Sequence, residues 1–160
     1  MEQQLVNQPI LLRLSALLQE RIGGFTKAST NLTTVCNVFE QQYEETESED
    51  DLVKYAQAKA DLARMQLGKR DYEPAIENAE MALDLSADIA TLAECRLSAH
   101  LTAGLAYYFS GKMAESLEMF KVALQESGEN PDVVTLLAQV LWAKGGEDER
   151  EAAREQLFAW

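Results

Sequence analysis

Apolar residues recur at intervals of three and four along most of the chain, the spacing that places them on one face of a helix. The first series has four members: Leu11, Leu14, Leu18 and Ile22. Pro9 precedes this series, and a proline is harmless in a first helical turn because the amide donors there have no partner within the helix. We therefore expect a helix that begins near Pro9 and ends before the pair Gly23 and Gly24.

A second series comprises Leu32, Val35, Phe39 and Tyr43. Threonine and valine residues weaken the helical propensity of this segment, but the spacing still favours a helix. The run EETESEDD, from Glu44 to Asp51, then contains no basic residue. We interpret it as a solvated helix end and connection, with a docking site for a basic partner as the alternative. Residues 1–51 are thus predicted to form an N-terminal helical pair, either a divergent repeat or a cap.

From residue 52 onward the sequence repeats itself. AIENAEMALDL at residues 75–85 aligns with SLEMFKVALQE at residues 116–126, so that small and large residues recur at the same places. A third copy starts at Pro131 and follows the second at about 34 residues, a period typical of helix-turn-helix repeats. We expect about two and a half to three repeats in residues 52–160. Their predicted ranges are 56–89, 90–130 and an incomplete 131–160.

The interval between the first and second copies exceeds this period by about seven residues, which is almost two helical turns. An insertion of that length extends a helix and leaves its apolar face pointing in nearly the same direction. The extra residues therefore predict one long helix from about Asp88 to Ser110. Its early residues Ile89, Leu92 and Cys95 are expected to project past the neighbouring repeat or to cap it.

The second copy, GLAYYFSGKMAESLEMFKVAL at residues 104–124, resembles the tetratricopeptide (TPR) repeat. In that repeat small residues, here Gly104 and Ser116, lie where two helices cross, and Gly111 takes the place of the turn. The resemblance implies an all-α fold, a right-handed superhelical array of antiparallel helix pairs with about seven or eight helices. The residues that carry the repeat are Leu62, Ala63, Ala75, Ala82, Gly104, Tyr107, Gly111, Ser116, Phe120, Ala123, Leu137, Ala138 and Gly145.

Fourteen basic residues against 27 acidic ones give the chain a formal net charge of −13. Such a charge repels phosphate backbones, so direct binding of nucleic acid is not expected. The sequence has no apolar run of about eighteen residues and no secretory signal at its start, and we expect a cytoplasmic protein without a membrane segment, nuclear presence being left open. Cys36 and Cys95 match no metal-binding or redox pattern and are predicted to be reduced, packed thiols.

Catalytic chemistry has little support in these residues. His100 is the only histidine, so neither a two-histidine metal site nor a recognisable nucleophile–base pair is available, and we predict a packed core histidine. The sequence has no glycine-rich phosphate-binding loop, and the acidic run lacks the spacing of a calcium loop. We therefore expect a protein that is not an enzyme and that binds no cofactor or metal.

In TPR arrays the first helix of each unit lines a concave groove, and the resemblance implies a candidate partner groove in this chain. Tyr108 and Trp142 are the candidate anchors, because aromatic residues are frequent at binding hot spots; packing against the next helix of the array is the alternative. Co-chaperones of this family hold a carboxylate with a lysine and asparagine clamp, which is absent here at positions such as Thr102 and Asp132. The groove positions are Ala60, Arg64, Leu67, Leu101, Leu105, Tyr108, Thr135, Gln139 and Trp142.

Two longer stretches, CRLSAHLTAGLAYYFSGKMAESLEMFKVALQES and PDVVTLLAQVLWAKGGEDEREAAREQLF, resemble the fungal large TPR subunit of the superkiller (Ski) complex. RIGGFTKASTNL, FEQQYEETES and AQAKADLAR extend the likeness over nearly the whole chain. The resemblance implies a non-enzymatic scaffold that holds helicase and WD-repeat subunits and supports exosome-mediated 3′–5′ decay of messenger RNA. That subunit is much longer, so we expect a fragment that adjoins further TPR repeats. The alternative is a free-standing peptide-docking module of co-chaperone type without a carboxylate clamp.

Overall fold

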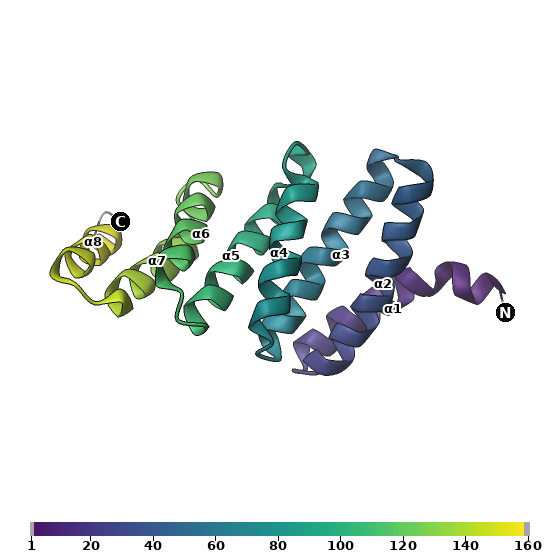
Figure 1. Ribbon diagram of the computed structural model, residues 1–160, viewed down its shortest axis with the longest axis horizontal. Helices are drawn as coiled ribbons and strands as arrows, with labels where there is room; N and C mark the ends of the chain where they lie inside the picture. The colour runs from purple at the N-terminus through teal and green to yellow at the C-terminus, as the bar shows by residue number, and fades with distance from the viewer. Residues whose placement is uncertain (1, 159–160) are drawn as a thin grey trace.

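The computed structural model describes residues 2–158, with side chains from residue 9 onward. Within this range the protein is all-helical, as predicted, and contains no strand (Figure 1). Its elements are α1 Glu2–Arg21, α2 Phe25–Thr46, α3 Glu49–Gly68, α4 Tyr72–Ser86, the 3-10 turn η1 Ala90–Leu92, α5 Ala93–Phe109, α6 Met113–Glu126, α7 Pro131–Lys144 and α8 Glu147–Phe158.

The helices form an elongated row in which each one packs against the next along the chain (Figure 1). The two ends of the chain lie at opposite ends of this row. Contacts that skip a helix are strongest between α3 and α5. Short connections make successive helices antiparallel, and a row of such pairs is the architecture of an α-solenoid. The prediction of a TPR-like helical array is therefore confirmed.

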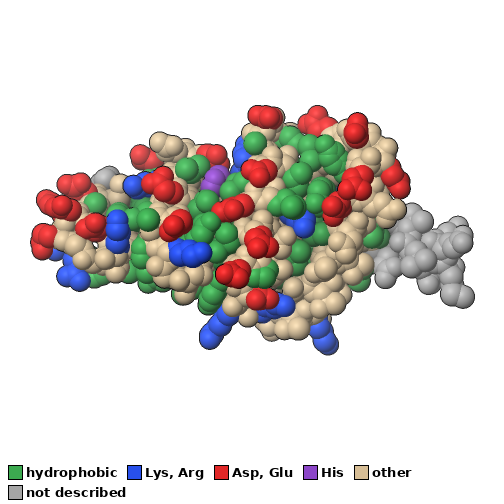
Figure 2. Space-filling model, in the orientation of Figure 1, with side chains coloured by type: hydrophobic (Ala, Val, Ile, Leu, Met, Phe, Trp, Pro, Cys, Tyr) green, Lys and Arg blue, Asp and Glu red, His purple; other side chains and the backbone are tan. Residues whose placement is uncertain are grey.

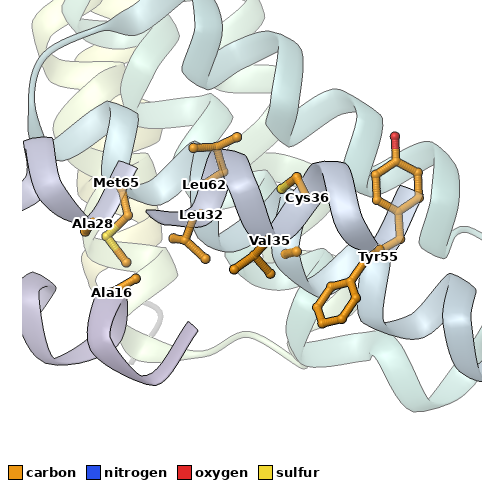
Figure 3. Close-up of a cluster of buried hydrophobic side chains, with 10 residues drawn as sticks. Ala16, Ala28, Leu32, Val35, Cys36, Tyr55, Leu62 and Met65 are labelled. Atoms are coloured by element: carbon orange, nitrogen blue, oxygen red, sulfur yellow. The ribbon is translucent and has the colours of Figure 1, made fainter. Parts of the chain in front are cut away.

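The second predicted series forms the core at the N-terminal end of the row (Figure 3). Leu32 and Val35 of α2 are fully buried and Phe39 nearly so, and they meet Leu62 and Met65 of α3. Alanines on three helices keep the backbones close enough for these large side chains to fill the space between them. The fully buried alanines of this cluster are Ala16, Ala28 and Ala58.

The second repeat shows how its small residues allow two helices to cross. Gly104 of α5 lies against the ring of Phe120 of α6, and a Cβ added at Gly104 would lie 2.8 Å from that ring. Ser116 Oγ donates a hydrogen bond of 2.7 Å to the carbonyl oxygen of Gly104. Phe120 and Ala123 are fully buried in the same interface. Gly111 forms the turn with φ +80°, a conformation that glycine adopts without steric cost.

The acidic run from Glu44 to Asp51 forms the end of α2, a short connection and the first turn of α3, as predicted. Glu47 takes a left-handed conformation with φ 51°, and Ser48 is the N-cap of α3. The Ser48 hydroxyl accepts a hydrogen bond from the Asp51 amide, while Thr46 and Ser48 donate to the Asp51 carboxylate. These hydrogen bonds lower the pKa of Asp51 below its usual 3.8.

The prediction of one long helix from Asp88 to Ser110 is wrong. Helix α4 ends at Ser86, and α5 begins only at Ala93, after the turn η1. Arg96 Nη1 donates to the carbonyl oxygens of Ser86 at 2.7 Å and Ile89 at 2.6 Å, so it satisfies backbone acceptors at the break. Ile89, Leu92 and Cys95 do not project from the array but are buried in the core between α3, α4 and α5.

The predicted start of the first helix is also wrong, because α1 begins at Glu2 and contains Pro9 in its interior. The helix packs on α2 through fully buried Ala16, with Leu12 and Leu17 half-buried beside it. The predicted apolar series lies instead on the open side of α1, since among the described residues no helix covers that face. Its exposed members are Leu11, Leu14, Leu18 and Ile22, together with Ile10.

Candidate protein-binding groove

A groove of about 910 Å³ lies between α5, α7 and α8 at the C-terminal end of the row. Five of the predicted groove residues line it together: Leu105, Tyr108, Thr135, Gln139 and Trp142. They share one side because residues three to four apart lie on one face of each helix. Leu101 lies next to them, half-buried against the apolar cluster that joins α6 and α7. The structure therefore brings five of the nine predicted positions together in one groove.

One wall of the groove is aromatic. Tyr108 and Phe109 meet edge to face, with ring centroids 5.3 Å apart and an interplanar angle of 79°. Phe109 also stacks on Tyr72 of α4 at 5.8 Å, yet 56% of its surface stays exposed. Phe109 was not among the predicted groove residues. Three consecutive aromatic residues on a helix span about 200° of its circumference, so they cannot all face its neighbours, and this run could have revealed it.

Trp142 of α7 and Arg154 of α8 also line the groove, and Arg150 lies beside the Trp142 ring outside this lining. The guanidinium carbons of Arg150 and Arg154 lie 5.0 Å and 5.6 Å from the Trp142 ring centroid, within the range of cation–π attraction. Trp142 remains 48% exposed. The arginines are four residues apart and so lie on the same side of α8, a spacing that is visible in the sequence although neither was among the predicted groove residues.

The groove continues along α8 to exposed Leu157 and Phe158. Ala153 is buried against α7, and this small residue lets the two helices approach closely. The turn before α8 places Gly145 at φ +80°. Apolar side chains thus dominate the lining of the groove, and Arg154 is the charged residue among the described residues that line it.

Arg64 lies outside this groove, on α3. Its Nη1 is 3.1 Å from Asp61 Oδ1, and its Nε and Nη2 donate to both carboxylate oxygens of Glu20 on α1. Arg13 Nε, also on α1, donates to Asp61 Oδ2 at 3.0 Å. Burial acts to lower the pKa of Arg64, but the hydrogen bond that Arg64 donates to Glu20 and the charge of Asp61 outweigh this effect and raise the pKa above its ordinary value. Arg64 therefore ties α1 to α3.

His100 and the two cysteines are packed between helices, as predicted. His100 is 8% exposed, and burial lowers its pKa below the ordinary 6.5, although Glu126 at 3.5 Å from Nδ1 acts in the opposite direction. Burial raises the pKa of Cys36 to about 12 and that of Cys95 to about 11. Both thiols therefore stay protonated near neutral pH, where a thiol is a poor nucleophile and a poor metal ligand.

Acidic side chains outnumber basic ones on the face of the molecule shown in Figure 2, in keeping with the net charge of −13. Among the side chains of residues 9–158 no group of three or more His, Cys, Asp and Glu is placed to hold a metal ion. No helix of the described chain is both long enough and apolar enough to cross a membrane.

No protein-family model matches the chain. The chain is 39% identical over 147 residues to Superkiller protein 3 of Schizosaccharomyces pombe and 29% identical over 149 residues to Superkiller protein 3 of Saccharomyces cerevisiae. Each match covers 91% of this chain but only 11% and 10% of the two relatives. The chain thus spans about a tenth of the length of the curated relatives it matches, and its resemblance to a superkiller subunit is confirmed.

Proposed function

We propose that this chain is a non-enzymatic protein-interaction scaffold that acts as a segment of the TPR subunit of a superkiller complex. The observation that carries the proposal is the similarity to Superkiller protein 3 from two yeasts over 91% of the chain. The helical array supports it, because a solenoid offers long surfaces on which partners dock. Residues 1–51 serve as the divergent N-terminal pair or cap, and residues 52–160 as the two and a half to three repeats.

The partners in this proposal are helicase and WD-repeat subunits, and the assembly supports exosome-mediated 3′–5′ decay of messenger RNA in the cytoplasm. The chain contributes surface for docking, while contact with RNA falls to other subunits. Its net charge of −13 supports this division, because such a surface repels phosphate groups. Cysteine and histidine are catalytic residues in many enzymes. In this chain the protonated thiols of Cys36 and Cys95 and the buried side chain of His100 support a structural role instead.

A replacement in Schizosaccharomyces pombe tests the proposal. This chain replaces the matching segment of tagged Superkiller protein 3, and a second strain lacks that segment. We expect the chimera, but not the deletion, to recover helicase and WD-repeat subunits on purification and to restore the half-life of a reporter messenger RNA that is degraded from its 3′ end. An abundant, folded chimera that recovers no more of either subunit than the strain without the segment would contradict the proposal.

A second candidate is a free-standing peptide-docking module of co-chaperone type without a carboxylate clamp. The groove between α5, α7 and α8 favours it, because its volume of about 910 Å³ and its mainly apolar lining are within the range of ligand-binding clefts. Under this alternative the purified chain binds short peptides, and the chimera gains nothing over the deletion strain. The two candidates therefore predict opposite results in the replacement experiment.

A further inference from the structure

Helix α1 is joined to the first helix of the next pair differently from the way that the following pairs are joined. Helices α3 and α5 pack directly on each other, and their shared core contains small residues such as Ala60, Ala99 and Ala103. Helices α1 and α3 are the equivalent two helices one pair earlier, yet within residues 2–158 their backbones are not closely packed. Charged side chains span the distance between them instead.

Four residues make this bridge, two from each helix. Arg13 Nε of α1 donates to Asp61 Oδ2 of α3. In the opposite direction Arg64 of α3 donates to both carboxylate oxygens of Glu20 of α1, with Nη2 3.0 Å from Oε1. A guanidinium with two parallel hydrogen bonds to one carboxylate fixes a direction as well as a distance. The four side chains can therefore define the angle between the two helices.

Apolar packing contributes little to the position of α1. Ala16 is the fully buried residue of its contact with α2, and the larger Leu12 and Leu17 are only half-buried there. The connection from α1 to α2 is short and contains Gly23, with φ +78°, followed by Gly24. A few such residues between two helices can absorb the change in backbone angles when one helix turns.

A position of α1 away from α3 is accessible because it leaves no buried charge alone. Asp61 is 7% exposed, and it also accepts from Arg64 Nη1 at 3.1 Å within the same helix. Arg64 therefore remains its counter-charge when Arg13 leaves, which avoids the cost of an unpaired buried carboxylate. Arg13 also lines two cavities of about 230 Å³ and 200 Å³, which give its side chain room to change rotamer.

We propose that Arg13, Glu20, Asp61 and Arg64 form an ionic latch that sets the angle of α1 to the rest of the array. In the open state α1 turns about Gly23 and Gly24, while Arg64 stays on Asp61. The side chains of Arg13, Arg64 and Glu20 are 36%, 31% and 26% exposed, so dissolved ions screen the latch and weaken it as ionic strength rises. Any chain joined before α1 turns with it, and the latch thus sets the direction in which the array extends from α1.

Distances between two nitroxide labels on the purified chain, measured by double electron–electron resonance, test the latch. The labels are attached to Leu11→Cys in α1 and Glu77→Cys in α4, both at exposed positions, while buried Cys36 and Cys95 stay unlabelled. The test variant is Arg13→Gln/Glu20→Gln, which removes both groups that α1 contributes and leaves Asp61 paired with Arg64. We expect a narrow distance distribution with the latch intact, and a shifted, broader one in the variant.

Salt provides a second readout. Raising NaCl from about 0.1 M to about 1 M shortens the Debye length from about 10 Å to about 3 Å. The distribution of the protein with an intact latch should move toward that of the variant, and the variant itself should not respond. Arg21→Gln/Glu44→Gln is the matched control, because it also removes one positive and one negative charge, at exposed positions outside the latch. It should keep the distribution and the salt response of the intact latch.

A second pair of labels, Glu77→Cys in α4 and Glu118→Cys in α6, reports on the array without α1. This distance should be the same in all proteins, and circular dichroism should show unchanged helix content. The latch would be refuted by an unchanged Leu11–Glu77 distribution in Arg13→Gln/Glu20→Gln, or by an equal shift in the control variant. A loss of helix content in place of a shift would show that α1 unfolds rather than turns, and would overturn the proposal as well.

Discussion

Gly104 provides the sharpest test of how the repeat packs. In an ordinary helix interior, Gly→Ala stabilises by about 1 kcal/mol, because alanine has the higher helix propensity. At Gly104 the new methyl group would lie 2.8 Å from two carbons of the Phe120 ring, closer than van der Waals contact allows. Phe120 is fully buried and cannot move away freely, so we assign about 2 kcal/mol to this overpacking. Gly104→Ala should therefore destabilise the protein by about 1 kcal/mol.

The change should reverse its sign when the ring is removed. In a Phe120→Leu background the methyl group no longer meets the ring, so Gly104→Ala should stabilise by about 1 kcal/mol relative to Phe120→Leu alone. Urea unfolding followed by circular dichroism gives the free energies of unfolding of all four proteins. Glu118, an exposed residue of α6, supplies the control: the difference between Glu118→Ala and Glu118→Gly reports the propensity of alanine over glycine alone. Stabilisation by Gly104→Ala in the wild-type background would refute this account of the crossing.

Three further predictions concern backbone strain, protonation and thiol reactivity. Arg70 has φ 66° at the turn that matches Gly111, so Arg70→Gly should raise the free energy of unfolding by about 0.5–1 kcal/mol in urea, whereas a loss would contradict strain at this turn. The pKa of His100 in the folded protein lies below the 6.5 of an unfolded chain, so the unfolded state takes up the proton first as pH falls. Acidification from neutral pH through this range should therefore lower the free energy of unfolding more in the wild type than in His100→Gln. Equal decreases in the two proteins would contradict this prediction. The pKa values of Cys36 and Cys95 are about 12 and 11, so both thiols should resist a thiol-specific reagent near neutral pH in the native state. Both should react once urea unfolds the chain. Fast labelling of either thiol in the folded protein would contradict the prediction.

The helices could be predicted from sequence because their spacing is local information. Leu32, Val35 and Phe39 face the core as their intervals indicate, despite the β-branched residues around them. The turns at Arg70 and Gly111 lie at aligned positions, since both end the first helix of a repeat in a left-handed conformation. The spacing of apolar residues thus predicted the helices and their arrangement in a row, because both depend on contacts between adjacent helices.

The errors concern features that depend on tertiary contacts. Arg96 satisfies the carbonyl groups at the break before α5, and neither the break nor this contact can be read from helical spacing. The series on α1 has the pattern of a buried face, yet its burial depends on whether another helix lies beside it. Five positions of the groove could be predicted from the repeat pattern, whereas Phe109 and Arg154 required the positions of α4, α7 and α8 in space.

The row of helices also has a mechanical consequence. Its strongest contacts join helices that are adjacent in the chain, and among residues 2–158 only α3 and α5 pack strongly across an intervening helix. In an array in which each element contacts mainly its neighbours, small changes in the angle at successive interfaces add up along the row. Such changes are expected to alter the distance between the first and the last described helix. A partner that bound both ends would have to bend or stretch the chain against the stiffness of its helix interfaces. Substitutions that overpack Gly104 or that relieve backbone strain at Arg70 would be expected to change this stiffness.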